Sequence, residues 1–156
     1  MSELYDEDIL LWSERQSALL RRIASGEPVN EHPDWPNIIE EVESVGREQL
    51  HAVEALLLQA LVHMLKADGW PVSRDTDNWR ADARGFLAQA RRRFAPSMRQ
   101  NIDLPGIYTD ALNALPRQMD GQAPQPLRGD CPVTLDELLG GEGSVCRVGK
   151  FADRER

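Results

Sequence analysis

Four residues on either side of one predicted turn have the types that bind anions: His63, Lys66, Trp79 and Arg80. Between them, the stretch Asp68-Gly69-Trp70-Pro71 must end a helix, because proline cannot continue one and glycine can form its left-handed cap. A short connection then brings the end of the first helix near the start of the next, whose N-terminal amides favour negative charge. The four residues therefore predict a cationic, aromatic-walled corner that binds an anion or a small metabolite.

The same four residues also fit a structural role, and their types favour this second interpretation. Trp79 would then lie in the core, and His63 would be a hydrogen-bonded histidine at its edge. Arg80 would form an ion pair with Asp8 or with a glutamate. A structure in which the side chains do not converge would exclude the anion site, because a binding site needs convergent groups.

Glu40 and Glu43 share a helical face, and with His63 they at first suggest a carboxylate–histidine metal site. Metal sites in helical bundles pair a glutamate and a histidine three residues apart. Here His63 follows Glu43 by twenty residues, which is about 30 Å along a straight helix. We therefore predict no metal. Instead we predict a solvated or salt-bridged acidic face, with Arg80 or Arg84 as partners.

Signatures of catalysis and of cofactor binding are lacking. Cys131 and Cys146 lie fifteen residues apart, without the Cys-x-x-Cys spacing of zinc and redox sites. The sequence contains no P-loop, no glycine fingerprint after a strand and no Gly-x-Ser-x-Gly motif. We therefore expect no cofactor and assign no catalytic residue, which favours a protein that is not an enzyme.

The elements that position these residues are all predicted to be helices, because apolar residues recur at three- and four-residue steps and never alternate as in a sheet. The longest pattern predicts a central helix over about residues 35–67, with Gly46 as the place for a kink or a break. Shorter patterns predict helices over residues 7–24, 79–94 and 107–115, and a terminal helix through Leu139. The predicted fold class is all-α: a compact bundle of four to five helices around one long central helix.

The length of 156 residues fits one domain. The helical patterns end at Gly140-Gly141, so we predict a single helical-bundle domain over residues 1–141. Residues 142–156 have little apolar content and no clear period, so we expect a mobile C-terminal tail.

Charge is acidic and unevenly distributed. The net charge is −8, and residues 1–43 hold eleven acids against three arginines, which accounts for the whole surplus. Because affinity for phosphate backbones needs clustered lysine and arginine, nucleic acid is not an expected partner. Apolar runs are shorter than the ~20 residues of a membrane span, and the first residues are acidic where a signal peptide is basic. We therefore expect a cytoplasmic protein without a membrane partner.

The end of the predicted central helix carries more apolar residues than one neighbouring helix can cover. They are Leu56, Leu57, Leu58, Leu61, Met64 and Leu65. An uncovered strip there predicts a protein-interaction module that binds a protein partner or forms a homo-oligomer. The alternative is an anion- or metabolite-binding bundle at the corner of His63 and Arg80, with catalysis left open.

Six motifs, taken in order and spacing, resemble a bacterial family of domains of unknown function, family 29, over about residues 4–140. They are Tyr5-Asp6-x-Asp8 with Trp12 and Gln16, Ile39-Glu40-Glu41-Val42-Glu43-Ser44-Val45-Gly46, His63-Met64-Leu65-Lys66, Trp79-Arg80, Pro96-Ser97-Met98, and Cys131-Pro132-Val133-Thr134-Leu135 with Leu138-Leu139. The resemblance implies an all-helical bundle and brings no activity, substrate or cofactor. Two stretches depart from the family pattern. Ala67-Asp68-Gly69 displace the aromatic residue that usually follows the histidine–lysine motif, and Leu104-Pro105-Gly106 interrupt a stretch that is usually continuous helix.

Overall fold

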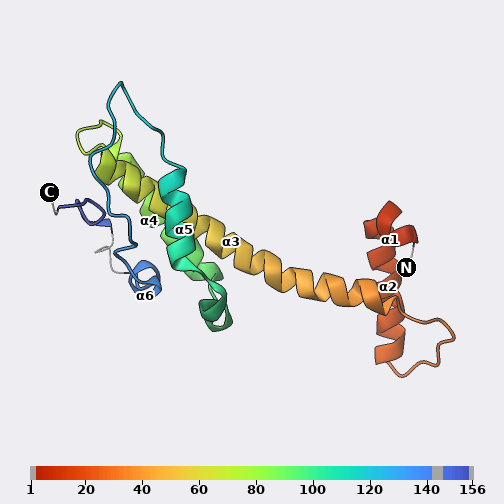
Figure 1. Ribbon diagram of the computed structural model, residues 1–156. Coiled ribbons are helices and arrows are strands. Elements are labelled where there is room, and N and C mark those ends of the chain that lie inside the picture. Colours follow the sequence, from red (N-terminus) through yellow and green to blue (C-terminus); the bar gives the residue numbers. More distant parts are fainter. Residues whose placement is uncertain (1–2, 142–145, 155–156) are drawn as a thin grey trace. The chain divides into compact units, whose positions relative to one another are not determined.

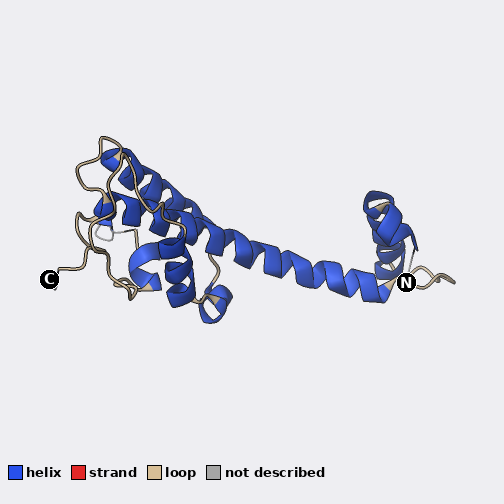
Figure 2. Cartoon of the chain, turned by 45° about the horizontal axis from the view of Figure 1, so that its top comes forward, coloured by secondary structure: helices blue, strands red, loops and turns tan. Residues whose placement is uncertain are grey.

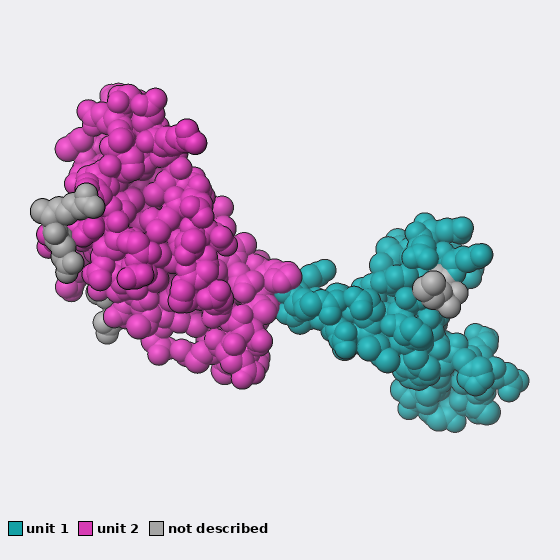
Figure 3. All heavy atoms as spheres, in the orientation of Figure 1, with its two compact units in different colours: residues 1–48 teal, residues 49–156 magenta. Residues whose placement is uncertain are grey.

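The computed structural model describes residues 3–141 and 146–154. Every regular element in these ranges is a helix (Figure 2), and strand-like pairing is limited to two isolated bridges, Met119–Gln122 and Leu127–Ala152. The predicted all-α helical bundle is thus confirmed. The chain divides into two compact units, residues 1–48 and residues 49–156 (Figure 3). The single domain over residues 1–141 stays a prediction.

Unit 1 contains α1 (Glu3–Glu7), α2 (Ile9–Ala24) and the first part of α3 (Trp35–Gly69) (Figure 1). The predicted helix over residues 7–24 was wrong at its start. The Asp8 carboxylate accepts the backbone N–H of Leu11 at 3.0 Å, which makes Asp8 the N-cap of α2. The short helix α1 precedes this cap as a separate element.

Asp34 joins α2 to the start of α3. Its Oδ2 accepts the indole N–H of Trp12 at 3.0 Å and the side-chain amide of Asn37 at 2.8 Å, and its backbone N–H donates to Gln16 at 2.9 Å. The bond from Asn37, together with the bond from Trp12, outweighs desolvation and lowers the pKa of the Asp34 carboxyl. The hydrogen bonds that hold α2 to the start of α3 are therefore stronger when the Asp34 carboxyl is ionised.

The helix α3 is continuous from Trp35 to Gly69, so it ends two residues beyond the predicted range and has no break at Gly46. A glycine inside a helix costs about 0.5–1 kcal/mol relative to alanine, which the rest of a long helix can tolerate. By length and composition alone, α3 contains a window apolar enough to cross a membrane. Within the structure 44% of that window is buried, and the core helix of a soluble protein passes the same criterion.

Unit 2 combines residues 49–69 of α3 with α4 (Thr76–Arg93), the 3₁₀ helix η1 (Pro96–Asn101), α5 (Leu104–Asn113) and α6 (Leu135–Leu139). Apolar residues from these elements and from the C-terminal segment form one core cluster. Its large, fully buried members include Leu57, Leu61, Met64, Leu65, Tyr108, Leu138 and Phe151.

The helix α5 begins earlier than predicted, at the stretch that was expected to interrupt it. Asp103 is its N-cap and accepts the backbone N–H of Gly106 at 3.1 Å. Pro105 lies in the first turn, where the N–H that proline lacks would have no intrahelical partner. Leu104-Pro105-Gly106 is therefore a helix start. The short helix after Thr134 has the predicted capping box with Glu137.

The described part of the C-terminal tail differs from the expected mobile segment. Cys146 and Phe151 are buried in the core cluster, with 6% and 1% exposed. Two apolar side chains and backbone hydrogen bonds are enough to hold this segment, although its average hydrophobicity predicts no packing. The rest of the predicted tail, residues 142–145 and 155–156, lies outside the described residues.

Candidate functional site

Asp68, the residue before the end of α3, is a carboxylate with 0% of its side chain exposed. Its Oδ1 accepts Nη2 of Arg80 at 2.9 Å and the backbone N–H of Gly149 at 2.9 Å, and its Oδ2 accepts the N–H of Phe151 at 2.8 Å. Arg80 also donates Nη1 to the carbonyl of Cys146 at 3.2 Å. We call Asp68, Arg80, Gly149 and Phe151 the Asp68 clasp.

The Asp68 clasp ties three segments together: the end of α3, the first turns of α4 and the C-terminal segment. A buried charge is tolerated only when it is paired and its remaining hydrogen-bonding positions are satisfied. Asp68 meets this requirement with one guanidinium and two backbone amides. Because the carboxylate and the arginine are directed at each other inside unit 2, the clasp has a structural role.

The predicted anion corner is not assembled in this structure. Arg80 forms its ion pair with Asp68. The structural interpretation expected Asp8 or a glutamate as its partner. His63 is hydrogen-bonded through Nδ1 to the Gln59 carbonyl at 2.8 Å, and its Nε2 lies 3.8 Å from Asp82. This is the edge position that the structural interpretation describes.

The other two corner residues have surroundings that differ from those of Arg80. Lys66 is partly buried on α3 and forms no ion pair with another described residue. Trp79 lines a cavity of about 430 Å³ with Trp70 and Asp75, whereas Arg80 lines a different cavity beside Pro71. The four side chains therefore do not converge on one site.

The predicted acidic face has a partner on its own helix. Arg47 lies 2.7 Å from Glu40 and 3.7 Å from Glu43, in place of the expected Arg80 or Arg84. Four- and seven-residue steps put these side chains on one side of α3. Glu41 accepts the hydroxyl of Tyr5 at 2.5 Å, and this bond, with burial and nearby carboxylates, raises the pKa of Tyr5 to about 12.

The apolar strip predicted at the end of α3 is covered. Leu57, Leu61, Met64 and Leu65 are fully buried, and Leu56 and Leu58 pack partly buried against the core. The strip was expected to exceed the reach of one neighbour. Several segments cover the strip together, because α4, α5, α6 and the C-terminal segment all contribute residues to the same core cluster. This strip is therefore not available to a partner.

The exposed apolar row of α3 lies in unit 1 instead. Trp35, Ile39, Val42 and Val45 expose 50%, 54%, 70% and 60% of their surface. Steps of four and three residues keep them on one face of the helix. We call these four residues the α3 stripe.

A family model, "Domain of unknown function DUF29", matches residues 4–142. The chain belongs to the DUF29 family. The match agrees with the resemblance carried by the six sequence motifs. A solved structure, described as an α-helical protein of unknown function from Rhodospirillum rubrum ATCC 11170, is similar with a TM-score of 0.60 and 21% identity. The similarity covers 94% of this chain and 96% of that chain, and it shows the fold alone. No match was found among curated proteins.

Two features of this DUF29 chain depend on tertiary structure and are not predicted by its sequence pattern. The sequence pattern assigns Asp68 only to the stretch that ends the helix. Asp68 nevertheless follows Leu61 and Leu65 at helical steps, and so it lies on the buried face. The apolar residues of the α3 stripe recur at helical steps, as do the buried leucines near the end of the same helix. The two rows differ in how many other segments pack over them, and this depends on tertiary structure.

Proposed function

We propose that unit 1 is a protein-interaction module, and that the α3 stripe binds an amphipathic helix with lysines and arginines beside its apolar face. The observation that carries the proposal is the exposure of four large apolar residues in one row on α3. Contiguous exposed apolar patches mark interaction sites, and tryptophan is enriched where binding energy concentrates. A helix bound along such a row is a common mode of peptide recognition.

The size of unit 1 supports a need for a partner. It spans residues 1–48, and only Trp12 and Leu19 among its described apolar residues are buried. A unit this small buries too little surface for an extensive core of its own. A partner helix laid on the α3 stripe would supply the missing cover.

Charge supports a basic partner. Residues 1–48 contain twelve acids and four arginines, a net charge of −8. Two of the arginines are already used within unit 1: Arg22 pairs with Glu27 and Glu31, and Arg47 pairs with Glu40 and Glu43. The remaining negative surplus attracts a cationic segment and repels a second copy of the same unit.

The test uses the full chain and a synthetic helix of about four turns made of leucine and lysine, labelled for fluorescence anisotropy. We expect saturable binding. The variant Val42→Ser/Val45→Ser should weaken it about tenfold or more, since burying a valine contributes roughly 1.5–3 kcal/mol. Val72→Ser/Val148→Ser is the matched control. It removes two valines of similar exposure, 85% and 73%, from unit 2.

A peptide of the same pattern with glutamate in place of lysine should not bind. Equal affinity of the wild-type chain and the stripe variant for the lysine peptide would overturn the proposal. So would sedimentation that shows a wild-type dimer and a monomeric stripe variant, because a second copy would then occupy the stripe.

A further inference from the structure

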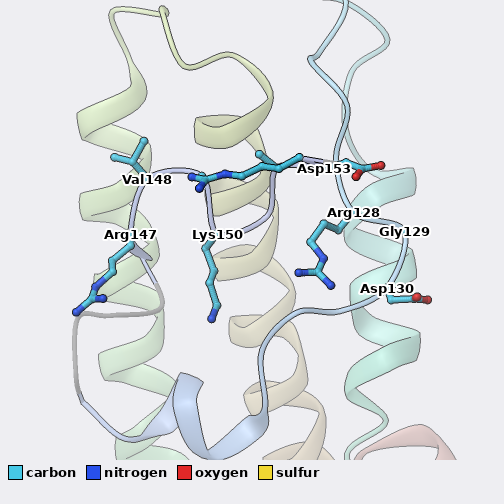
Figure 4. A pocket seen from close by; sticks show the side chains of 10 residues that line it. Arg128, Gly129, Asp130, Arg147, Val148, Lys150 and Asp153 are labelled. Carbon is cyan, nitrogen blue, oxygen red and sulfur yellow. The ribbon is translucent and has the colours of Figure 1, made fainter. Parts of the chain in front are cut away.

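Unit 2 contains a cavity of about 580 Å³ between two segments that are far apart in sequence (Figure 4). Residues 128–130 form one wall, and residues 147–150 with 152–154 form the other. This volume is within the range of cavities that bind small molecules, about 300–1,000 Å³. None of the residues that line this cavity belongs to the α3 stripe or to the four corner residues.

Cations dominate the lining of this cavity. Arg128, Arg147, Lys150 and Arg154 line it, against the two carboxylates of Asp130 and Asp153. Within residues 3–141 and 146–154, none of the four cations forms an ion pair. We call these four residues the cationic cluster.

The side chains are directed in a way that favours an anion. In Figure 4, Arg128 and Lys150 extend in the same direction from the two walls, and the carboxylates of Asp130 and Asp153 point away from Lys150. Positive charge from Arg128 and Lys150 therefore lies on one side of the cavity, whereas Arg147 extends away from Lys150. This positive charge lies on a chain whose net charge is −8.

The backbone that carries the cationic cluster is held in place. The N–H of Arg128 donates to the Phe151 carbonyl at 2.9 Å, and the N–H of Asp153 donates to the Pro126 carbonyl at 2.9 Å. Between them lies the isolated bridge Leu127–Ala152. The Asp68 clasp fixes the same segment from inside through Gly149 and Phe151.

A fixed backbone matters because ordering flexible groups on binding reduces affinity. The cations of the cavity need to order only their side chains. Guanidinium groups match the oxygens of phosphate in a two-pronged geometry, and lysine adds a compact point charge.

We propose that this cavity binds a small molecule that carries a phosphate or diphosphate group. The cationic cluster holds its oxygens, and the backbone hydrogen bonds Arg128–Phe151 and Asp153–Pro126 hold the two walls together. The site is independent of the interaction proposed for unit 1, because none of its residues belongs to residues 1–48.

The experiment is calorimetric titration of the full chain with inorganic pyrophosphate, against sodium chloride at matched ionic strength. We expect saturable binding at one site per chain. Arg128→Gln/Lys150→Gln should weaken it about tenfold or more, because each substitution removes a charge-assisted hydrogen bond to the phosphate oxygens. The control Arg92→Gln/Arg93→Gln removes the same charge from the last turn of α4, outside the cavity, and should leave the affinity within about twofold of wild type.

Two results of this titration would overturn the proposal. Absence of saturable heat at matched ionic strength is one, and equal weakening by both double variants is the other, since that would show attraction by general charge. A single-stranded oligonucleotide that displaces pyrophosphate at far lower concentration would also contradict a small-molecule ligand.

Discussion

Eighteen of the twenty buried apolar residues in the described part of the chain belong to unit 2, whereas seven of its nine large exposed apolar residues belong to unit 1. Charge divides in the same way. Residues 1–48 carry a net charge of −8, and residues 49–156 contain fourteen acids and fourteen cations. The two units draw on similar apolar residues, yet one packs them inward and the other presents them to solvent beside carboxylates.

The different roles proposed for the two units rest on this difference. In unit 2, other segments cover its part of α3, and the buried ion pair between Asp68 and Arg80 links the end of α3 to α4. Unit 1 has few segments that could cover its part of α3. Hydrogen bonds at Asp34 and Tyr5 connect its helices. The four residues of the α3 stripe stay exposed within unit 1, and this exposure is the basis of the interaction proposed for it.

The largest effect is expected for Asp68→Ala. It would leave the Arg80 guanidinium buried without its partner and two backbone amides without their acceptor. We expect the free energy of unfolding in denaturant to fall by about 3–5 kcal/mol. Asp82→Ala, at an acid that is 58% exposed and 3.8 Å from His63, should change it by less than about 0.5 kcal/mol. Losses of similar size in both variants would argue against the clasp.

A pair of truncations on α3 compares the two units directly. Leu61→Ala removes a fully buried side chain of unit 2 and should lower the free energy of unfolding by about 2–5 kcal/mol. Val45→Ala acts on a side chain that is 60% exposed in unit 1, and it should change the same quantity by less than about 0.5 kcal/mol. A large loss for Val45→Ala would show that the stripe is covered in the isolated protein.

A smaller, pH-dependent effect is expected at Asp34 in unit 1. The pKa of its carboxyl is lowered in the folded chain from the ordinary 3.8. Its contribution to stability is therefore present above that value and is lost as the pH falls through the lowered folded pKa. The near-ultraviolet circular dichroism of Trp12 should change in this acid range.

The variant Asp34→Asn should lose that acid transition, because it has no carboxyl to protonate. Glu14→Gln, at an exposed acid on α2, serves as its control and should keep the wild-type profile. An unchanged transition in Asp34→Asn would mean that another group titrates.

The sequence predicted most of the helices, but it did not predict which segments pack against them. The long apolar period of α3 and the capping box at Thr134 predicted those elements because their causes are local. The start of α5 was misread because Pro105 can either end a helix or occupy its first turn, and only the Asp103 cap distinguishes the two.

The candidate sites depend on contacts between distant segments. Asp68 and Arg80 are twelve residues apart, but the amides that complete the clasp come from Gly149 and Phe151, about eighty residues later. No local pattern links these positions. The cationic cluster likewise joins Arg128 to residues 147–154, so its members cannot be recognised as a group until the two segments pair.

The most direct test of the two roles is hydrogen exchange of the full chain with and without the leucine–lysine helix. The account predicts slower exchange of backbone amides within residues 35–48 when the peptide is bound, and unchanged exchange in the core helices α4 and α5 of unit 2. Protection that appears only in unit 2, or no protection at any residue under saturating peptide, would contradict it.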